Sequence, residues 1–175
     1  MSDQRLEFQP GQYLEWTLGR GHSDSRGRRR YFTIASSPTE ANIRIGVKFY
    51  PRASTFKRAL AKMQPGETIV ASQLAGDFVL PRDKKQKLVF IAGGIGITPF
   101  RSMIKYLMDW NEPRNIILFY SVKTADELAY KEIFDAALQI GVKVIYVITD
   151  ETGFITGPMI AKDVPDYRER LFYLS

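Results

Sequence analysis

The sequence predicts two small domains in a chain of 175 residues: an incomplete antiparallel β-barrel, followed by an incomplete doubly wound α/β domain built on a parallel sheet. Three observations predict this fold class. Short β-rich segments separated by turn signals fill the first half, and continuous apolar strands alternate with helical patterns in the second half. A charged run over residues 82–87 carries no apolar side chain and separates the halves. We therefore expect one domain over residues 1–84 and another over residues 85–175.

Turns and alternating side chains define the elements of the first domain. Pro-Gly and Ser-Pro pairs between its apolar segments favour turns. One helix is expected to begin at Ser54 or Thr55, because Phe56, Leu60 and Met63 then share one of its faces. Strands are expected over residues 12–18, 31–36, 43–49 and 68–74.

Strands and helices alternate in the second domain. A helix over residues 98–110 is expected to begin with Thr98 as its cap. The apolar residues at helical spacing on its expected buried face are Phe100, Met103, Ile104, Leu107 and Met108. A second helix over residues 125–140 follows the capping box that Thr124 and Glu127 form in the sequence. Because the strands of this half are apolar without alternation, they predict a parallel sheet covered on both faces. They are expected over residues 88–92, 116–120, 142–149 and 171–174.

The composition excludes several classes of function. Hydrophobic residues make up 45% of the chain and charged residues 25%, the balance of a folded globular protein. There is no cysteine, and His22 is the only histidine, so we expect no disulfide framework, no cysteine nucleophile and no metal site. The longest nearly apolar run, residues 88–100, holds three glycines and is too short to cross a bilayer, and no secretory leader opens the chain. We expect a cytoplasmic location, or the cytoplasmic face of a membrane if the chain belongs to a larger protein.

Positive charge is concentrated in the first half of the chain. Residues 1–87 carry 16 Lys and Arg against 8 Asp and Glu, whereas residues 88–175 carry 9 against 11. A basic half favours an anionic partner. The arginine run from Arg26 to Arg30 is of a kind that nucleic-acid-binding proteins use. The rest of the chain has no recognition-helix pattern and no second basic cluster of similar density, so we expect no nucleic-acid partner.

The segment from Gly93 to Pro99 has the pattern of an anion-binding turn. It connects an apolar strand directly to a helix, and Gly93, Gly94 and Gly96 allow a tight turn and a close approach of the backbone to a ligand. The positive end of the following helix lies at the same place. The dinucleotide fingerprint G-x-G-x-x-G is matched except for Pro99, which takes the place of the third glycine. The expected ligand is a pyrophosphate group, and the alternative is a glycine turn that binds nothing.

A second motif, Arg30-Tyr31-Phe32-Thr33, suits a ligand with a phosphate at one end and a planar ring at the other. It resembles the flavin motif R-x-[YF]-[ST] of the ferredoxin–NADP reductase superfamily. The segment Gly93–Pro99 is similar to the pyridine-nucleotide loop of that superfamily, whose G-x-G-x-x-P form accounts for the proline. Further landmarks of the family occur in the same order along nearly the whole chain, at residues 10–12, 47–48, 54–55 and 76–78.

The resemblance implies an FAD-dependent NAD(P)H oxidoreductase module. Such a module transfers a hydride from the nicotinamide of NAD(P)H to N5 of FAD, and then electrons to a protein, a quinone or a small acceptor. At the matching positions, the resemblance implies that Arg30 holds the flavin pyrophosphate together with Ser54 and Thr55. It also implies that Phe32 packs against the isoalloxazine ring and that Thr33 forms a hydrogen bond near its N5.

The resemblance assigns further residues to the two cofactors. Val47 and Lys48 are expected to line the adenosine diphosphate portion. The residues expected to position the nicotinamide nucleotide are Gly93, Gly94, Gly96 and Thr98.

The nucleotide preference follows from the end of the second strand of the α/β domain. A site that prefers NAD is expected to carry a carboxylate there. In this chain the strand ends with Ser121 and Lys123, and no carboxylate occurs before Asp126. Because a hydroxyl and a cation suit a 2′-phosphate, the sequence favours NADPH over NADH.

Both ends of the chain are short compared with the family. Fewer strands precede the first turn, and Ser175 stands where the family has the first residue of a C-G-P-P-like loop, so the resemblance places Ser175 near the catalytic centre with Thr33. The chain is then a fragment of a larger redox protein, or a reduced version completed by dimerisation, since unpaired strand edges favour self-association. The alternative function is an inactive fragment that binds a nucleotide or a partner. Expected partners are NAD(P)H, an acceptor protein or membrane redox domain, and a second copy of the chain.

Overall fold

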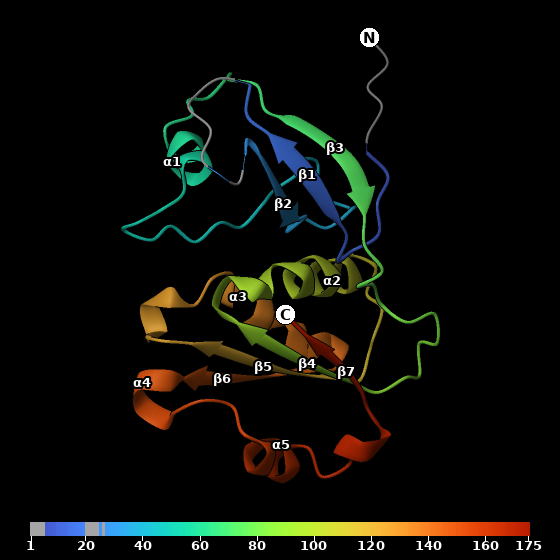
Figure 1. Ribbon diagram of the computed structural model, residues 1–175. Coiled ribbons are helices and arrows are strands. Elements are labelled where there is room, and N and C mark those ends of the chain that lie inside the picture. The colour runs from blue at the N-terminus through green and yellow to red at the C-terminus, as the bar shows by residue number, and fades with distance from the viewer. Residues whose placement is uncertain (1–5, 20–24, 26) are drawn as a thin grey trace.

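The chain folds into two sheets with helices between and around them (Figure 1). The computed structural model describes residues 6–19, 25 and 27–175, and both His22 and Arg26 lie outside these ranges. In the view of Figure 1 the antiparallel sheet lies above the parallel sheet. Helices α2 (Thr98–Asp109) and α3 (Lys131–Ala136) lie between the two sheets. An antiparallel unit followed by a parallel α/β unit confirms the predicted fold class.

The antiparallel sheet has three strands in the order β2-β1-β3. Helix α1 (Thr55–Ala61) follows Ser54, whose hydroxyl accepts a hydrogen bond from the backbone N–H of Lys57 and so caps the helix, as expected. The helix buries Phe56 in a small core with Leu14, Trp16, Leu18 and Ile34. The strands are β1 (Tyr13–Thr17), β2 (Arg29–Thr33) and β3 (Val70–Ala75).

The segment over residues 43–49 is a strand in the prediction but forms only one bridge, between Ile45 and Ile34. The backbone N–H of Ala35 donates to the carbonyl of Arg44 at 2.8 Å, and the pairing goes no further. The reason lies at Gly46, which packs against the other half of the molecule. A Cβ atom at Gly46 would lie 2.5 Å from Cγ2 of Thr98. The segment therefore follows the surface of the α/β half instead of continuing along β2.

All four strands of the second sheet are parallel, in the order β6-β5-β4-β7. The chain builds outward from β4 through β5 to β6 and then returns to place β7 on the other side of β4. In sheets of this kind, ligands bind beyond the carboxyl ends of the strands, where the order reverses. The glycine loop follows β4 at that end. The strands are β4 (Leu88–Gly93), β5 (Ile116–Val122), β6 (Val142–Ile148) and β7 (Leu171–Leu174).

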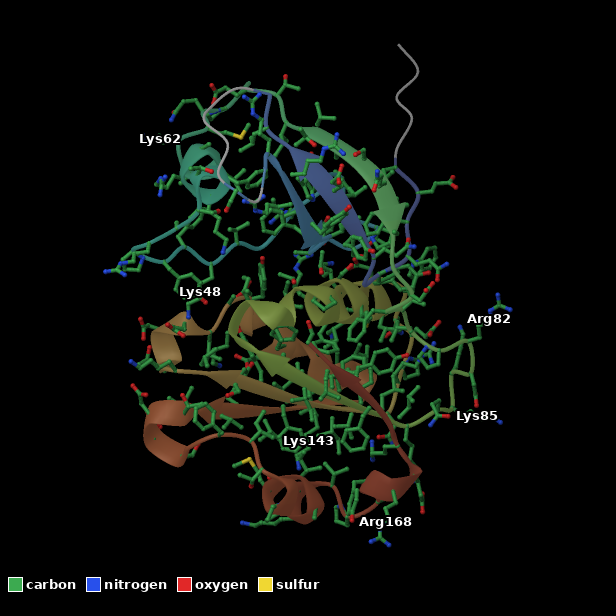
Figure 2. The ribbon with its side chains drawn as sticks, viewed as in Figure 1. Lys48, Lys62, Arg82, Lys85, Lys143 and Arg168 are labelled. Atoms are coloured by element: carbon green, nitrogen blue, oxygen red, sulfur yellow. The ribbon has the colours of Figure 1, made fainter. Side chains whose placement is uncertain are left out.

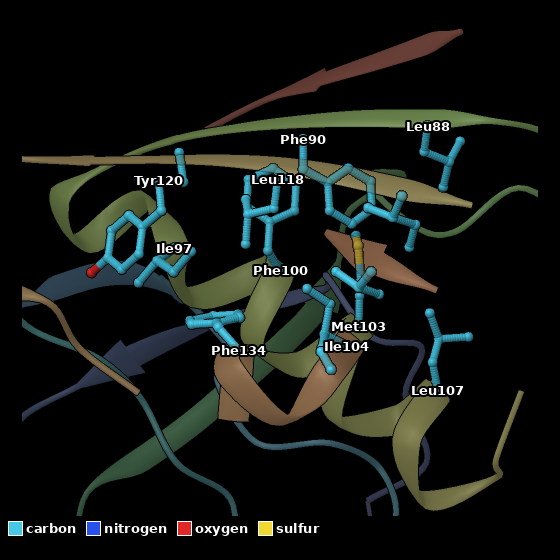
Figure 3. Packing of buried hydrophobic residues seen from close by; sticks show 14 of the residues in the cluster. Leu88, Phe90, Ile97, Phe100, Met103, Ile104, Leu107, Leu118, Tyr120 and Phe134 are labelled. Atoms are coloured by element: carbon cyan, nitrogen blue, oxygen red, sulfur yellow. The ribbon is translucent and has the colours of Figure 1, made fainter. Parts of the chain in front are cut away.

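The main hydrophobic core lies between this sheet and helices α2 and α3 (Figure 3). Phe100, Met103, Ile104 and Leu107 follow the helical spacing that the sequence predicted, and all four are fully buried. Phe100 stacks on Phe90 of β4 with 4.5 Å between ring centroids. A second cluster lies between the other face of the sheet and α5 (Gly157–Asp163). The remaining short helices are η1 (Gly94–Ile97), η2 (Ala125–Glu127), η3 (Ala137–Ile140), α4 (Thr149–Thr152) and η4 (Tyr167–Glu169). Within the described ranges, every helix is too short or too polar to cross a membrane.

The helix expected over residues 125–140 is interrupted, and that prediction was wrong in its first part. The short helix η2 ends at Glu127 because Leu128 is extended, and Tyr130, which has the left-handed φ of +59°, directly precedes α3. The capping box does not form, because the Thr124 side chain makes no capping bond and the Glu127 carboxylate pairs with Lys48 instead. Thr98 is also not a cap: it is the first residue of α2, and its hydroxyl donates to the carbonyl of Ile95.

Arg101 on α2 joins the two halves of the molecule. Its guanidinium forms a bidentate ion pair with Glu40 and donates to the carbonyl of Ala35 at 3.0 Å. The neighbouring hydroxyl of Ser102 donates to the carbonyl of Ser36 at 2.7 Å. Burial by itself would raise the pKa of Glu40, but hydrogen bonds from Arg101 and from the backbone of Ser37 outweigh it and lower the pKa. The pair is therefore charged at neutral pH and holds α2 against the segment that follows β2.

Replacing Arg101 by alanine is expected to lower the free energy of unfolding by about 3 kcal/mol, because the Glu40 carboxylate and the Ala35 carbonyl then lose a buried partner. Lys105→Ala on the same helix is the control, since it removes an exposed ion pair with Asp109 worth about 0.5 kcal/mol or less. Urea unfolding measures both. Equal losses in the two variants would show that Arg101 does not hold the halves together.

Candidate functional site

The glycine loop leaves open space at the end of β4. Gly94 has φ +53°, which favours glycine, and a Cβ atom on Gly93 or Gly94 would meet no other atom within 4 Å. Gly96 is different, because a Cβ atom there would lie 2.5 Å from the backbone carbonyl of Ser175. The backbone N–H of Gly93 also donates to that carbonyl at 3.0 Å. The loop is therefore open on the side of Gly94 and closed by Ser175 at Gly96.

A pocket of about 210 Å³ lies beside the open side of this loop. Both halves of the chain contribute to it. The antiparallel half supplies the segment after the Ile45 bridge, which Gly46 allows to approach Thr98 and Ile95 closely. The α/β half supplies the glycine loop, the end of β5 and the loop that follows it. The lining residues are Val47, Lys48, Gly94, Ile95, Tyr120, Glu127 and Ala129.

An ion pair crosses the pocket from one half to the other. Nζ of Lys48 lies 2.8 Å from Oε1 of Glu127, and both side chains remain about one-third exposed (32% and 29%). In Figure 2 Lys48 reaches from the antiparallel half toward the loop before α3. The hydrogen bond between them raises the pKa of Lys48 and lowers the pKa of Glu127. Both groups are thus charged at neutral pH, and the pocket offers one cation and one carboxylate.

Tyr120 forms the floor of the pocket from the middle of the sheet. Its side chain is fully buried, and its phenolic oxygen accepts a hydrogen bond from the backbone N–H of Ala129 at 3.1 Å. Burial raises the pKa of Tyr120, so the phenol stays neutral. This bond fixes the far end of the loop that carries Glu127.

The arginine motif lies on β2. The Arg30 guanidinium donates to the carbonyls of Gly27 and Arg29 and lies 5.5 Å from the centroid of the Phe56 ring. Phe32 packs on the same ring at 5.9 Å. Thr33 is the last residue of β2, directly before the segment that Arg101 binds. The strand thus leads from Arg30 to the boundary between the halves.

The structure links two groups of predicted residues through Lys57. Its backbone N–H donates to the hydroxyl of Ser54, and its ammonium donates to the carbonyl of Lys48 at 2.7 Å. Thr55, the first residue of α1, is next to this cap. The ring of Tyr50 lies within 5.7 Å of the Lys48 ammonium and 5.4 Å of the Lys57 ammonium. The segments over residues 47–50 and 54–57 therefore form one basic surface beside the pocket.

The remaining predicted residues lie at the carboxyl ends of the parallel strands. Ser121 pairs with Gly93 across β4 and β5, and Lys123 follows at the end of β5. Several residues that line the pocket or shape it were not predicted as site residues. Glu127 had been assigned to a capping box, and Tyr120 to a buried strand. The non-local contact with Lys48, which the sequence pattern does not display, places Glu127 at the site. Tyr120 and Ile95 line the pocket from the end of β5 and from the glycine loop, and Gly46 packs beside Ile95.

The chain is similar in sequence to known oxidoreductases and flavohemoproteins. Residues 90–160 match the oxidoreductase NAD-binding domain. The chain is 29% identical over 171 residues to an NADPH oxidoreductase of Mycobacterium tuberculosis, an alignment covering 94% of this chain and 44% of that protein. It is 32% identical over 147 residues to a flavohemoprotein of Bacillus subtilis, covering 83% of this chain and 36% of that protein. The chain thus spans less than half the length of both relatives.

A solved structure shares the fold. The ferredoxin-NADP⁺ reductase of Plasmodium falciparum, crystallised as a mutant with 2'P-AMP, superposes with a TM-score of 0.78 at 21% identity. The superposition covers 95% of this chain and 74% of the reductase chain. At this level of identity the likeness establishes the fold, and it extends over both sheets.

Alanine at Gly96 is expected to lower the free energy of unfolding by about 1–3 kcal/mol, because the new methyl group meets the Ser175 backbone and the end of β7 must shift. Gly93→Ala is the matched control, since a Cβ atom there meets open space and φ is −109°. Urea unfolding of the two variants tests the packing. A stable Gly96→Ala variant, indistinguishable from Gly93→Ala, would contradict the contact between the glycine loop and Ser175.

Proposed function

We propose that the chain is a flavin-dependent NAD(P)H oxidoreductase module of the ferredoxin–NADP reductase kind, because residues 90–160 match the oxidoreductase NAD-binding domain and the fold is that of a ferredoxin-NADP⁺ reductase. The proposed reaction moves a hydride from NAD(P)H to FAD, and then electrons to a protein, a quinone or a small acceptor. The observation that carries the proposal is the pocket between the halves, where the glycine loop after β4 meets the basic segment of Val47 and Lys48.

The glycine loop fits the diphosphate of a pyridine nucleotide. Gly94 lines the pocket with open space where a side chain would be, so a ligand can approach the backbone closely. Helix α2 begins directly after this loop, and its 12 residues place the positive end of the helix dipole there. We assign Gly93, Gly94, Gly96 and Thr98 to the nicotinamide nucleotide, with Ser175 beside them because its carbonyl contacts the loop.

The residues of β2 and α1 fit a flavin nucleotide. Arg30 supplies a cation next to aromatic side chains, Phe32 offers a ring surface, and Thr33 ends the strand at the boundary between the halves. Ser54 and Thr55 are connected to Lys48 through Lys57, so the cations of this half form one surface for a diphosphate. These contacts support FAD, which has a pyrophosphate, as the flavin.

The protein's part in the proposed reaction is to hold two cofactors in line. FAD, when bound, supplies the chemistry: it accepts a hydride and releases single electrons or a pair. The chain's own residues align the nucleotides. The contact between the two halves at Arg101 and Glu40, here called the seam, sets the position of β2 relative to the glycine loop. We place the domain boundary at residues 84 and 85, which separates the strands of the two sheets.

The preferred nucleotide in this proposal is NADPH. Ser121 and Lys123 at the end of β5 supply a hydroxyl and a cation for a 2′-phosphate. The relative in Mycobacterium tuberculosis is named as an NADPH oxidoreductase, which supports the same preference. The electron acceptor is another protein, a membrane redox domain or a small molecule, and a second copy of the chain is a further possible partner.

Arg30→Ala is expected to lower FAD affinity about tenfold or more, because a charge-assisted contact to the flavin pyrophosphate is lost. Arg168→Ala is the control, since Arg168 contacts Tyr167 at the far end of the molecule (Figure 2). The visible spectrum of each purified protein, recorded before and after addition of NADPH, gives flavin content and reduction.

Three outcomes of this experiment are informative. A yellow wild-type protein that bleaches with NADPH, together with a pale Arg30→Ala variant, supports the proposal. Unchanged flavin content in Arg30→Ala contradicts the assignment of Arg30. A wild-type protein that takes up no added FAD but gains thermal stability with NADPH would instead indicate a nucleotide-binding fragment without turnover.

Lys123→Ala is expected to weaken NADPH binding about fivefold to tenfold and to leave NADH binding nearly unchanged, because only NADPH carries the 2′-phosphate. Lys143→Ala is the control: this exposed lysine near the start of β6 lies at the opposite end of the sheet. Isothermal titration of both nucleotides measures the effect. Equal losses for the two nucleotides would rule out Lys123 as the source of the preference.

A further inference from the structure

Tyr130, the residue directly before α3, has a backbone conformation that aromatic residues rarely adopt. Its φ of +59° and ψ of +26° lie in the left-handed region, where a bulky side chain strains the backbone and glycine does not. Such a conformation persists only where the surrounding structure holds it, and strained residues of this kind cluster at functional sites. The contacts of the Tyr130 side chain identify what holds it.

The ring of Tyr130 packs at the contact between the two halves. The guanidinium carbon of Arg101 lies 5.5 Å from the ring centroid, within the range of a cation–π interaction. The phenolic oxygen lies next to Gly46, where an added Cβ atom would come within 3.1 Å of it. The side chain is partly buried and packs against the main core. It therefore contacts both the buried cation of α2 and the segment of the antiparallel half that approaches the pocket.

Gly46 connects Tyr130 to the glycine loop. An added Cβ atom at Gly46 would also lie 3.0 Å from Cδ1 of Ile95 and 2.5 Å from Cγ2 of Thr98. Gly46 is thus enclosed by Tyr130 and by the glycine loop with the start of α2. Tyr130 is therefore packed, through one glycine, against the loop that lines the pocket.

The backbone around Tyr130 connects the pocket to α3. Ala129 directly precedes it and lines the pocket, and the backbone N–H of Ala129 donates to the phenol of Tyr120. The carbonyl of Tyr130 accepts a hydrogen bond from the N–H of Ile133 at 3.0 Å, at the start of α3. The left-handed turn at Tyr130 therefore sets the direction in which the chain passes from the pocket wall into the helix. A change of conformation at Tyr130 would move Ala129 relative to the glycine loop.

We propose that Tyr130 is a positioning residue of the nucleotide pocket: its ring, held by Arg101 and Gly46, keeps Ala129 at a fixed distance from the glycine loop. This inference rests on the proposed function, since it takes the pocket to bind a pyridine nucleotide. Within the described part of the chain, Tyr130 is not one of the residues that line the pocket, so it acts through Ala129 and not by touching the ligand. The contacts of the ring offset the strain of the backbone, and the pocket wall is preorganised before a ligand enters.

The test separates the ring of Tyr130 from its backbone conformation. Tyr130→Gly removes the ring and adopts the same φ without strain. It is expected to weaken NADPH binding about tenfold, because Ala129 and the glycine loop are no longer held at one distance before binding. Tyr130→Phe keeps the ring on Arg101 and is expected to stay within about twofold of the wild-type affinity. Isothermal titration of NADPH into the full chain measures the dissociation constant and the fraction of the protein that binds.

Two further variants complete the comparison. Tyr130→Asn also removes the ring, and asparagine tolerates the left-handed conformation, so this variant tests the inference if glycine at position 130 prevents folding. It is expected to lose about as much NADPH affinity as Tyr130→Gly. Asn111→Gly is the matched control, because Asn111 also has a left-handed φ, of +47°, but lies beyond the end of α2 that is remote from the glycine loop. The NADPH affinity of Asn111→Gly is expected to equal that of the wild type.

The results separate this inference from the proposed function. If Tyr130 served stability alone, its variants would unfold at lower urea concentration, but the dissociation constant of the folded protein would not change. That result overturns the inference, while the nucleotide site stands. An equal loss of affinity in Tyr130→Phe and Tyr130→Gly would assign the effect to the hydroxyl and would also overturn it, as would a loss of the same size in Asn111→Gly. If the wild-type chain binds no NADPH, the assignment of the pocket to a nucleotide fails, and the inference fails with it.

Discussion

The candidate site depends on one buried interaction, the ion pair between Arg101 and Glu40. The pocket has walls from both halves of the chain, so its shape exists only while the halves keep one relative position. Arg101 provides this constraint because the residue is only 4% exposed and its guanidinium binds both a carboxylate and the carbonyl of Ala35. This ion pair is geometrically specific, because two parallel hydrogen bonds fix both the direction and the distance between the guanidinium and the carboxylate. The helix that carries Arg101 begins at the glycine loop. Helix α2 therefore determines the positions of both the glycine loop and the contact between the halves.

Small residues allow the close packing around this seam. Gly46 and Gly96 have no room for a side chain, one against Thr98 and the other against the Ser175 backbone, whereas Gly94 faces open space. Two positions of the same loop therefore require glycine for different physical reasons. Packing against Ser175 requires Gly96, whereas the backbone conformation and the close approach of a ligand require Gly94. A sequence motif that lists glycines by position does not make this distinction.

The sequence predicted those parts of the fold that local patterns determine. The apolar strands β4 and β5, the buried face of α2 and the glycine loop follow from periodicity and residue type, and the structure contains them. The predictions that were wrong involve contacts between distant segments. Residues 43–49 are drawn away from β2 by packing at Gly46, and the expected helix over residues 125–140 is interrupted over residues 128–130. Glu127 satisfied a local capping pattern, but its partner Lys48 lies in the other half. Arg101 gave no signal in the sequence, because nothing local identifies its partner Glu40.

The ion pairs Arg101–Glu40 and Lys48–Glu127 both join the two halves, and their exposure to water differs in a way that suits binding. Arg101 is withdrawn from water, and separating it from Glu40 would leave a charge in a buried place, so this link stays closed. Lys48 and Glu127 are each about one-third exposed, and water and salt can replace their contact at small cost. A ligand with phosphate groups can therefore take Lys48 from Glu127 without disturbing the seam. The carboxylate released in this exchange remains fixed by its own loop, at the end of β5. Entry of an anion would thus change the partner of Lys48 but not the position of Glu127, so the pocket keeps its shape when its ion pair opens.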